Sequence, residues 1–278
     1  MSSMSNKLEG LPPIFYLNLD EDIHRRNLLE EQFEKYKIKN VKRFSASKYT
    51  PENFEEWKDL VHHSDIARTI DYNKICVAMS TLEKVRWWLE NTNEKYLILF
   101  EDDCDINLID YWHFDWEYLM NSIPYDWDCI QLGFTTHRFI NFFLHPKTVH
   151  SFHGPVLINR YFGEKLLRLN CINDKYLFFR KYGLSSNAIK WRIIGVDDFF
   201  AFSGRTYEIP LITQDPTLDG CKNGKKPHHF ACKELYYWWW ENERDKFSLD
   251  DFFTYEKSSD YKMTWGVDWQ KYEYVRKT

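Results

Sequence analysis

Apolar and polar positions along the 278-residue chain form two kinds of segment. Strands are predicted at residues 14–19, 41–44, 96–100, 128–133, 155–158 and 207–213, and the apolar runs at 14–19 and 96–100 are typical of strands buried on both faces. Apolar residues also recur at helical spacing after Asp22, over 75–89 with an end near Asn91, and over 166–169. Strands that alternate with amphipathic helices predict an α/β fold with a mainly parallel central sheet flanked by helices.

Two regions depart from this alternation. Residues 45–74 are polar and interrupted, which predicts a loop with one short helix. The last sixty residues are aromatic and irregular in pattern around a Tyr-Tyr-Trp-Trp-Trp run at 236–240, which fits either a core or a surface on which sugars stack. We expect a frayed N-terminus over 1–12, one domain over 13–215, and a C-terminal extension over 216–278 packed on that domain.

Composition narrows the class of protein. With 10 Gly, 9 Pro and 18% aromatic residues, the chain is neither collagen-like nor disordered. A net charge of −5 argues against a dedicated nucleic-acid binder, because such proteins neutralise phosphates with clustered Lys and Arg. The six cysteines include no CxxC pair, the first ten residues lack an apolar signal region, and no apolar stretch is long enough to span a bilayer. We therefore expect a cytoplasmic protein without a membrane span.

Three adjacent carboxylates follow the most apolar strand, at Glu101, Asp102 and Asp103. In open α/β sheets, ligands bind at the carboxyl ends of strands. Adjacent carboxylates raise one another's pKa unless a cation compensates them, and oxygen ligands favour Mg²⁺ or Mn²⁺. If the chain stays extended, Glu101 and Asp103 point one way and Asp102 the other, so the first two are the expected metal ligands. The plainer interpretation of these three carboxylates is a solvated acidic end of a strand.

Several common catalytic motifs are absent. No GxGxxG follows the first apolar run, and the chain contains no GxxxxGK[ST], GxSxG or HExxH. A Rossmann dinucleotide site, a P-loop, a nucleophile elbow and a zinc-protease helix are thereby disfavoured. What remains is a phosphate site bridged by a metal and built without glycines, which is how nucleotide-sugar enzymes hold their donors.

An ordered set of blocks resembles glycosyltransferase family 25, which includes lipooligosaccharide and collagen galactosyltransferases. The blocks are YLNLDEDIHRR at 16–26, MSTL at 79–82, LILFEDDC at 97–104, WDCIQLG at 127–133, HGPVLI at 153–158, VDD at 196–198 and PLITQ at 210–214. They span roughly 14–215 and fall in the family's order. Thr81 stands where the family has His, and Pro155 where it has Tyr.

The resemblance implies an A-type glycosyltransferase fold, a UDP-sugar donor, Mn²⁺ or Mg²⁺, and inversion at the anomeric carbon, with galactose or glucose passing to a hydroxyl acceptor such as a glycan. It assigns residues 13–215 as the catalytic domain and leaves the acceptor to the unmatched C-terminal extension. The implied roles are donor contact for Asn18, Arg25, Glu101 and Asp102, metal binding for Glu101 and Asp103 with His228 or His229 as a third ligand, and general base for Asp198 or Asp197.

Each implied role has a structural alternative. Arg25 fits a solvated helix face, Asp197 and Asp198 fit an N-cap pair, and His228 and His229 fit plain surface. Two other functions also use the same features. A metal-dependent phosphohydrolase would use the same acidic strand end, and a catalytically silent carbohydrate-binding protein would use the aromatic C-terminal segment.

Overall fold

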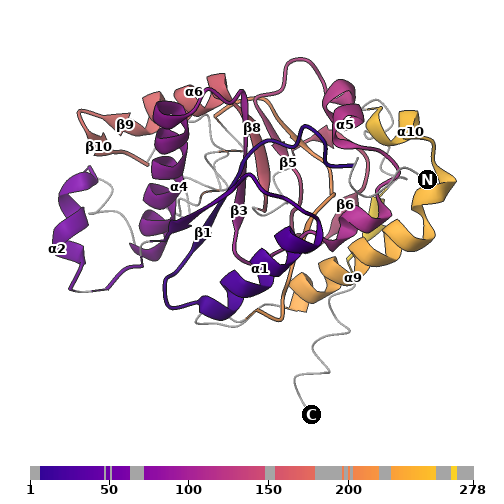
Figure 1. The fold of residues 1–278 in the computed structure, drawn as a ribbon, viewed down its shortest axis with the longest axis horizontal. Helices are drawn as coiled ribbons and strands as arrows, with labels where there is room; N and C mark the ends of the chain where they lie inside the picture. The colour runs from indigo at the N-terminus through magenta and orange to yellow at the C-terminus, as the bar shows by residue number, and fades with distance from the viewer. Residues whose placement is uncertain are drawn as a thin grey trace, which may run out of the picture.

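A computed structural model describes residues 7–46, 48–50, 52–62, 72–147, 154–178, 196, 200, 203–218, 227–254 and 264–267. Its centre is a seven-stranded mixed sheet in the order β2-β1-β3-β8-β5-β11-β7 (Figure 1). The strands are β1 (Ile14–Asn18), β2 (Val41–Ser45), β3 (Tyr96–Glu101), β5 (Cys129–Gln131), β7 (His145–Pro146), β8 (Val156–Asn159) and β11 (Thr206–Glu208).

Five of the seven strands run in the same direction. β2 and β3 pair in parallel with β1, and β11 pairs in parallel with β5, whereas β8 and β7 are antiparallel to their neighbours. β8 is reversed because the chain leaves β5 and enters β8 at the same edge, where Gln131 lies opposite Val156. The prediction of a mainly parallel sheet is confirmed, with one antiparallel strand in its middle.

Helices cover the two faces of the sheet with separate hydrophobic cores. α1 (Ile23–Lys35) packs on the face formed by Ile14, Tyr16, Ile98 and Phe100. α4 (Tyr72–Asn91) and α6 (Arg160–Asn170) pack on the other face, which alternate residues such as Phe15, Leu97 and Leu99 supply. This alternation is the period-2 pattern of buried strands. The helix predicted to end near Asn91 ends at that residue.

The C-terminal segment is more regular than its pattern indicated. Residues 227–242, expected to be irregular, form a helix, α9 (Pro227–Asn242), whose Tyr236, Trp239 and Trp240 are buried in the core shared with α1. Trp238 points outward and is 45% exposed. The aromatic run therefore serves mainly as core, because every third or fourth position of a helix faces the same side.

Short elements complete the fold. They are α2 (Phe54–Trp57), η2 (Lys58–Leu60), β4 (Cys104–Asp105), η3 (Asn107–Tyr111), α5 (Trp116–Ser122), β6 (Phe139–Asn141), β9 (Cys171–Ile172), β10 (Lys175–Tyr176), β12 (Thr213–Gln214), η4 (Arg244–Lys246), α10 (Leu249–Phe253) and β13 (Thr264–Gly266). α2 and η2 lie in the segment expected to be a loop with one short helix.

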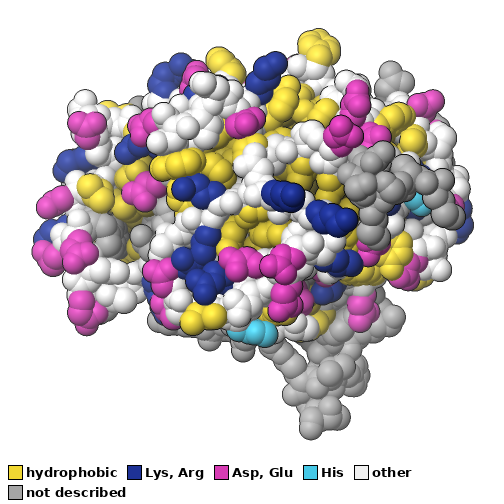
Figure 2. Space-filling model, viewed as in Figure 1, with side chains coloured by type: hydrophobic (Ala, Val, Ile, Leu, Met, Phe, Trp, Pro, Cys, Tyr) yellow, Lys and Arg dark blue, Asp and Glu magenta, His cyan; other side chains and the backbone are white. Residues whose placement is uncertain are grey.

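The surface does not concentrate charge of one sign on the face that carries α1. Lys and Arg side chains are interspersed with Asp and Glu there, around apolar side chains that show between the charged ones (Figure 2). Among the described residues, none of the helices combines the length and the hydropathy that a bilayer span requires.

Candidate functional site

The candidate site lies at the carboxyl edge of the sheet, the edge where β1, β2, β3, β5 and β11 end. Along the chain, β1 is followed by α1 and then by β2 on one side, whereas β3, which follows α4, pairs with the other side of β1. The order of strands therefore reverses between β1 and β3, and α1 and α4 lie on opposite faces (Figure 1). Open α/β sheets bind ligands in the crevice that such a reversal opens.

Residues from β1, α1 and the acidic block converge at this reversal. Asn18, the last residue of β1, is buried and donates from Nδ2 to Asp102 Oδ2 at 2.7 Å and to the Asp22 carbonyl at 3.0 Å. Arg25, in the first turn of α1, places its guanidinium 2.5 Å from Asp102 Oδ1 and 3.6 Å from Asp103 Oδ2. Two residues expected to contact the donor are thus brought against the acidic block from different elements.

The expected alternation of the three carboxylates does not hold. β3 ends at Glu101, and residues 102–103 form a turn that leads into β4, which pairs with β12. Because the chain turns, Asp102 and Asp103 both face Arg25 instead of opposite sides. Asp102 and Asp103 are buried and Glu101 is half-buried, so the argument that singled out Glu101 and Asp103 by extended geometry was wrong.

A buried lysine lies beneath the acidic block. Lys84 of α4 is 2% exposed, and its Nζ donates to the Phe100 carbonyl at 3.4 Å. Burial lowers the pKa of Lys84 to about 7, although the charges of Glu101 and Asp102 act in the opposite direction. Burial also raises the pKa of Asp102, against the opposing effects of Arg25 and of the hydrogen bond from Asn18. The block is therefore a poorly hydrated cluster of charges.

A second arginine orients Asn18 from the other side. Arg43 of β2 donates from Nε to Asn18 Oδ1 at 3.0 Å and from its terminal nitrogen to the Asn18 carbonyl at 3.3 Å, and it also pairs with Asp20. With its oxygen held by Arg43, the amide of Asn18 must direct its N–H groups toward Asp102. Sequence reasoning missed Arg43 and Lys84. The sequence signal for Arg43 was a basic residue within the predicted strand 41–44. The signal for Lys84 was a lysine among the apolar positions of the predicted helix 75–89.

The two histidines proposed as metal ligands lie at the start of α9. His228 is buried, with its ring centroid 3.8 Å from that of His137 and 4.3 Å from that of His229. Cys232, one turn further, exchanges hydrogen bonds with the backbone of Thr136, in the segment that follows β5. α9 therefore begins at the carboxyl edge, although among the described residues no three acidic, His or Cys side chains are grouped so that they could hold a metal ion.

The two candidate bases, Asp197 and Asp198, lie outside the described residues. Their described neighbours Val196 and Phe200 are buried in the core shared by α4 and α6, 8% and 1% exposed respectively.

A separate network of charged residues is buried where β5, β11 and β7 lie side by side in the sheet. Glu208, at the end of β11, is fully buried, with His145 Nε2 3.2 Å from one of its oxygens and Lys147 Nζ 3.1 Å from the other. Lys147 also donates to Gln131 Oε1 at 2.6 Å. A buried carboxylate needs such compensation, and breaking the network would leave an unpaired buried charge. This network joins β5, β7 and β11 and takes no part in the convergence at β1 and β3.

Comparisons with known proteins assign no family. No protein-family model matches the chain, and no curated protein matches it. Among solved structures, the chain is similar to A197 from STIV, with a TM-score of 0.39 and 14% identity, over 73% of this chain and 84% of that one. A similarity at this level does not assign a function, which rests instead on the residues of the site.

Proposed function

We propose that the chain is a metal-dependent inverting glycosyltransferase that moves a hexose, galactose or glucose, from a UDP-sugar to a hydroxyl acceptor such as a glycan. The observation that carries this proposal is the convergence of Asn18, Arg25 and the acidic block of residues 101–103 at the reversal between β1 and β3. That position is where open α/β sheets bind their ligands. The ordered resemblance to family 25 supplies the reaction class.

Arg25 is suited to hold the diphosphate of the donor. Its guanidinium is charged, since the carboxylates of Asp103, Asp102 and Glu101 outweigh the lowering effect of burial and raise its pKa. Its Nε–H is buried and has no hydrogen-bond partner among the described residues. A guanidinium offers five N–H donors in a planar fork, so it can keep Asp102 and bind a phosphate oxygen at the same time.

The carboxylate oxygens of the acidic block are the type of ligand that a hard divalent cation takes, although no three acidic, His or Cys side chains of the described residues are grouped to hold one. Its ligands would be carboxylate oxygens, and Mg²⁺ is typically bound by one or two carboxylates together with substrate phosphates. Asp102 accepts from Asn18 and lies 2.5 Å from Arg25, whereas Asp103 lies 3.6 Å from Arg25 and Glu101 is only half-buried. Glu101 and Asp103 are therefore the proposed metal ligands, with His228 or His229 as a third. A bound cation would supply charge compensation for the departing nucleoside diphosphate.

The chain's own residues would supply the rest of the chemistry. Inversion requires a carboxylate that accepts the proton of the acceptor hydroxyl on the face opposite the leaving group. We assign this role to Asp198, with Asp197 as the alternative. Lys84 and Arg43 would act indirectly, by fixing the acidic turn and Asn18.

Calorimetric titration of UDP tests the donor site. With Mn²⁺, UDP should bind the wild-type protein and bind at least about 10-fold more weakly to Glu101→Gln, Asp103→Asn and Arg25→Ala, because each loses a charged interaction. Glu117→Gln, an exposed change in α5, is the matched control. Undiminished UDP affinity in excess chelator would refute the metal requirement.

Product analysis separates the reaction classes. Incubation with UDP-galactose or UDP-glucose and an acceptor should give a new glycosidic product. Cleavage of the diphosphate to UMP and hexose 1-phosphate, with acceptor present, would instead favour the phosphohydrolase. UDP-sugar binding without either product would favour the silent carbohydrate-binding protein.

A further inference from the structure

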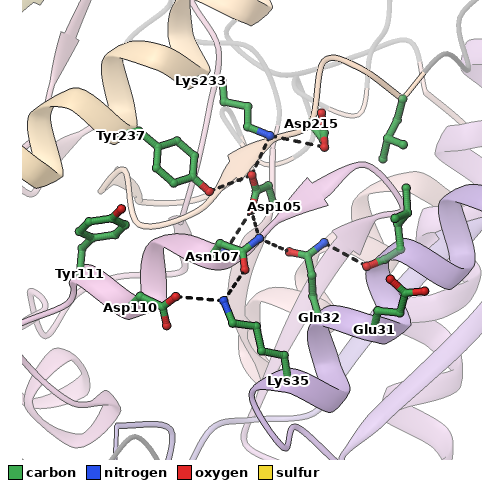
Figure 3. A pocket seen from close by; sticks show the side chains of 12 residues that line it. Glu31, Gln32, Lys35, Asp105, Asn107, Asp110, Tyr111, Asp215, Lys233 and Tyr237 are labelled. Atoms are coloured by element: carbon green, nitrogen blue, oxygen red, sulfur yellow. Dashed lines mark hydrogen bonds and ion pairs between the residues drawn. The ribbon is translucent and has the colours of Figure 1, made fainter.

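A polar cleft of about 560 Å³ lies beside the candidate donor site. Its walls come from α1, η3, α9 and the turn after β12 (Figure 3). Cavities that bind small organic ligands typically measure roughly 300–1,000 Å³. The cleft is therefore large enough for one or two sugar rings.

The inner wall of the cleft is a rigid network centred on Asp105. Asp105 is buried and accepts hydrogen bonds at 3.0 Å from the Tyr237 hydroxyl and at 2.8 Å from Asn107 Nδ2. Lys233 Nζ lies 2.8 Å from Asp105 and 3.4 Å from Asp215, between the two carboxylates (Figure 3). A wall built in this way needs little ordering when a ligand binds.

The groups that remain available in the cleft are mostly acceptors. Most of the hydrogen-bond donors in the cleft already have acceptors within the protein. Lys35 donates to Asn107 and Asp110, Lys233 to Asp105 and Asp215, and Gln32 to the carbonyls of Leu28 and Cys104. Glu31 is exposed and makes no hydrogen bond or ion pair with the described residues, and within the same part of the chain only one carboxylate oxygen of Asp110 is paired, with Lys35. A ligand must therefore bring donors.

The net charge of the side chains that line the cleft restricts the class of ligand further. Four carboxylates (Glu31, Asp105, Asp110, Asp215) and two ammonium groups (Lys35, Lys233) line the cleft, a net charge of −2. This disfavours a phosphate or a nucleotide, while the two ammonium groups disfavour a polycation. Tyr111 and Tyr237, in edge-to-face contact at 6.1 Å, add aromatic surface. Hydroxyl donors combined with apolar C–H faces are the features of a neutral saccharide.

The cleft and the candidate donor site share one short piece of backbone. Asp105 follows Asp103 by two residues, within β4, and the Asp215 N–H donates to the Asp103 carbonyl at 2.7 Å. β4 and β12 pair at the same place. A ligand in the cleft would thus lie next to the acidic turn, about one helical turn along α1 from Arg25, because Leu28 lines the cleft.

We propose that this cleft binds the saccharide acceptor, an inference that rests on the proposed glycosyltransferase function. The saccharide would be recognised by donating hydroxyl hydrogen bonds to Glu31 and Asp110 and by packing its apolar face on Tyr111. This places acceptor selection between α1 of the expected catalytic domain and α9 of the C-terminal extension.

Saturation-transfer NMR and calorimetric titration with galactose, glucose, lactose and maltose test the cleft directly. At least one of these sugars should bind the wild-type protein. Glu31→Ala should weaken that binding about 10-fold or more, the worth of one hydrogen bond to a charged group. Leu28→Trp should abolish it by filling the cleft, since Leu28 is a half-buried lining residue of α1. Glu34→Ala, an exposed change on α1 outside the lining, is the matched control.

UDP titration with Mn²⁺ on the same variants distinguishes the two proposals. UDP affinity that is equal in all of them, together with sugar binding lost only in the cleft variants, supports the acceptor site. If none of the four sugars binds, or if Leu28→Trp binds sugar as the wild type does, the cleft proposal is overturned while UDP binding still stands. Loss of UDP binding in the wild type would overturn the proposed function instead.

Discussion

Replacing Lys84 by methionine should stabilise the protein at pH 7 and remove part of its pH dependence. Lys84 is almost completely buried in α4, with the Phe100 carbonyl as its hydrogen-bond acceptor. Burial lowers the pKa of Lys84 from 10.5 to about 7. Methionine has a similar length and needs no hydration, so it can fill the same space without this cost.

The magnitude follows from linkage between protonation and folding. In the unfolded chain Lys84 holds its proton up to a pKa of 10.5, whereas in the folded chain it releases the proton near 7. Between these values the unfolded state binds more protons, so the free energy of unfolding rises with pH. At about 1.4 kcal/mol per pKa unit, the ammonium costs roughly 4 kcal/mol at pH 7, of which roughly 2 kcal/mol is recovered by pH 9.

Urea denaturation followed by tryptophan fluorescence measures this difference. The free energy of unfolding of the wild type should approach that of Lys84→Met by roughly 2 kcal/mol between pH 7 and pH 9. Lys74→Met, an exposed change on the same helix, should run parallel to the wild type over this range. If Lys84→Met also runs parallel to the wild type, the lysine does not carry a lowered pKa and the reasoning fails.

Three further changes test other parts of the structure. Trp239→Ala should lower the free energy of unfolding by about 3–5 kcal/mol because the side chain is fully buried, whereas Trp238→Ala, at 45% exposure, should change it by less than about 1 kcal/mol; equal effects in denaturation would contradict the orientation of α9. Arg25→Ala should cost about 3 kcal/mol, since it leaves the buried Asp102 without its cation, and an unchanged melting temperature would argue against the pair. Gly163→Val should destabilise by more than about 1 kcal/mol, because a Cβ there would lie 2.9 Å from the ring of Trp88, and unaltered stability would show that α4 and α6 can separate.

The local pattern of apolar residues was sufficient to predict a strand or helix wherever burial of one or two of its faces determines that element. The strands β1 and β3 and the helix α4 were predicted close to their observed bounds, since unbroken apolar runs and helical spacing report directly on burial. The helix α9 was missed because aromatic residues occupy both its buried and its exposed sides, as Trp239 and Trp238 illustrate. The direction of β8 was also beyond local pattern, because it depends on the edge at which a long connection re-enters the sheet.

The same division holds for the candidate site. The acidic block and its place at a strand end could be predicted from sequence, and so could Asn18 and Arg25 as candidates, through the family resemblance. That Asn18, Arg25 and Asp102 bind one another was decided by the strand order, which brings the ends of β1 and β3 together across about eighty residues of chain.

Hydrophobic spacing and residue identity are local properties, and they were enough to predict an α/β fold and the chemical type of the strand-end residues. Tertiary structure alone decided that the chain turns after Glu101, so that Asp102 and Asp103 face the same guanidinium. It alone placed Lys84 beneath them and set Lys233 of α9 between Asp105 and Asp215. These arrangements depend on which distant segments pack together and which buried charges they bring into contact. The spacing of residues along the chain does not contain that information.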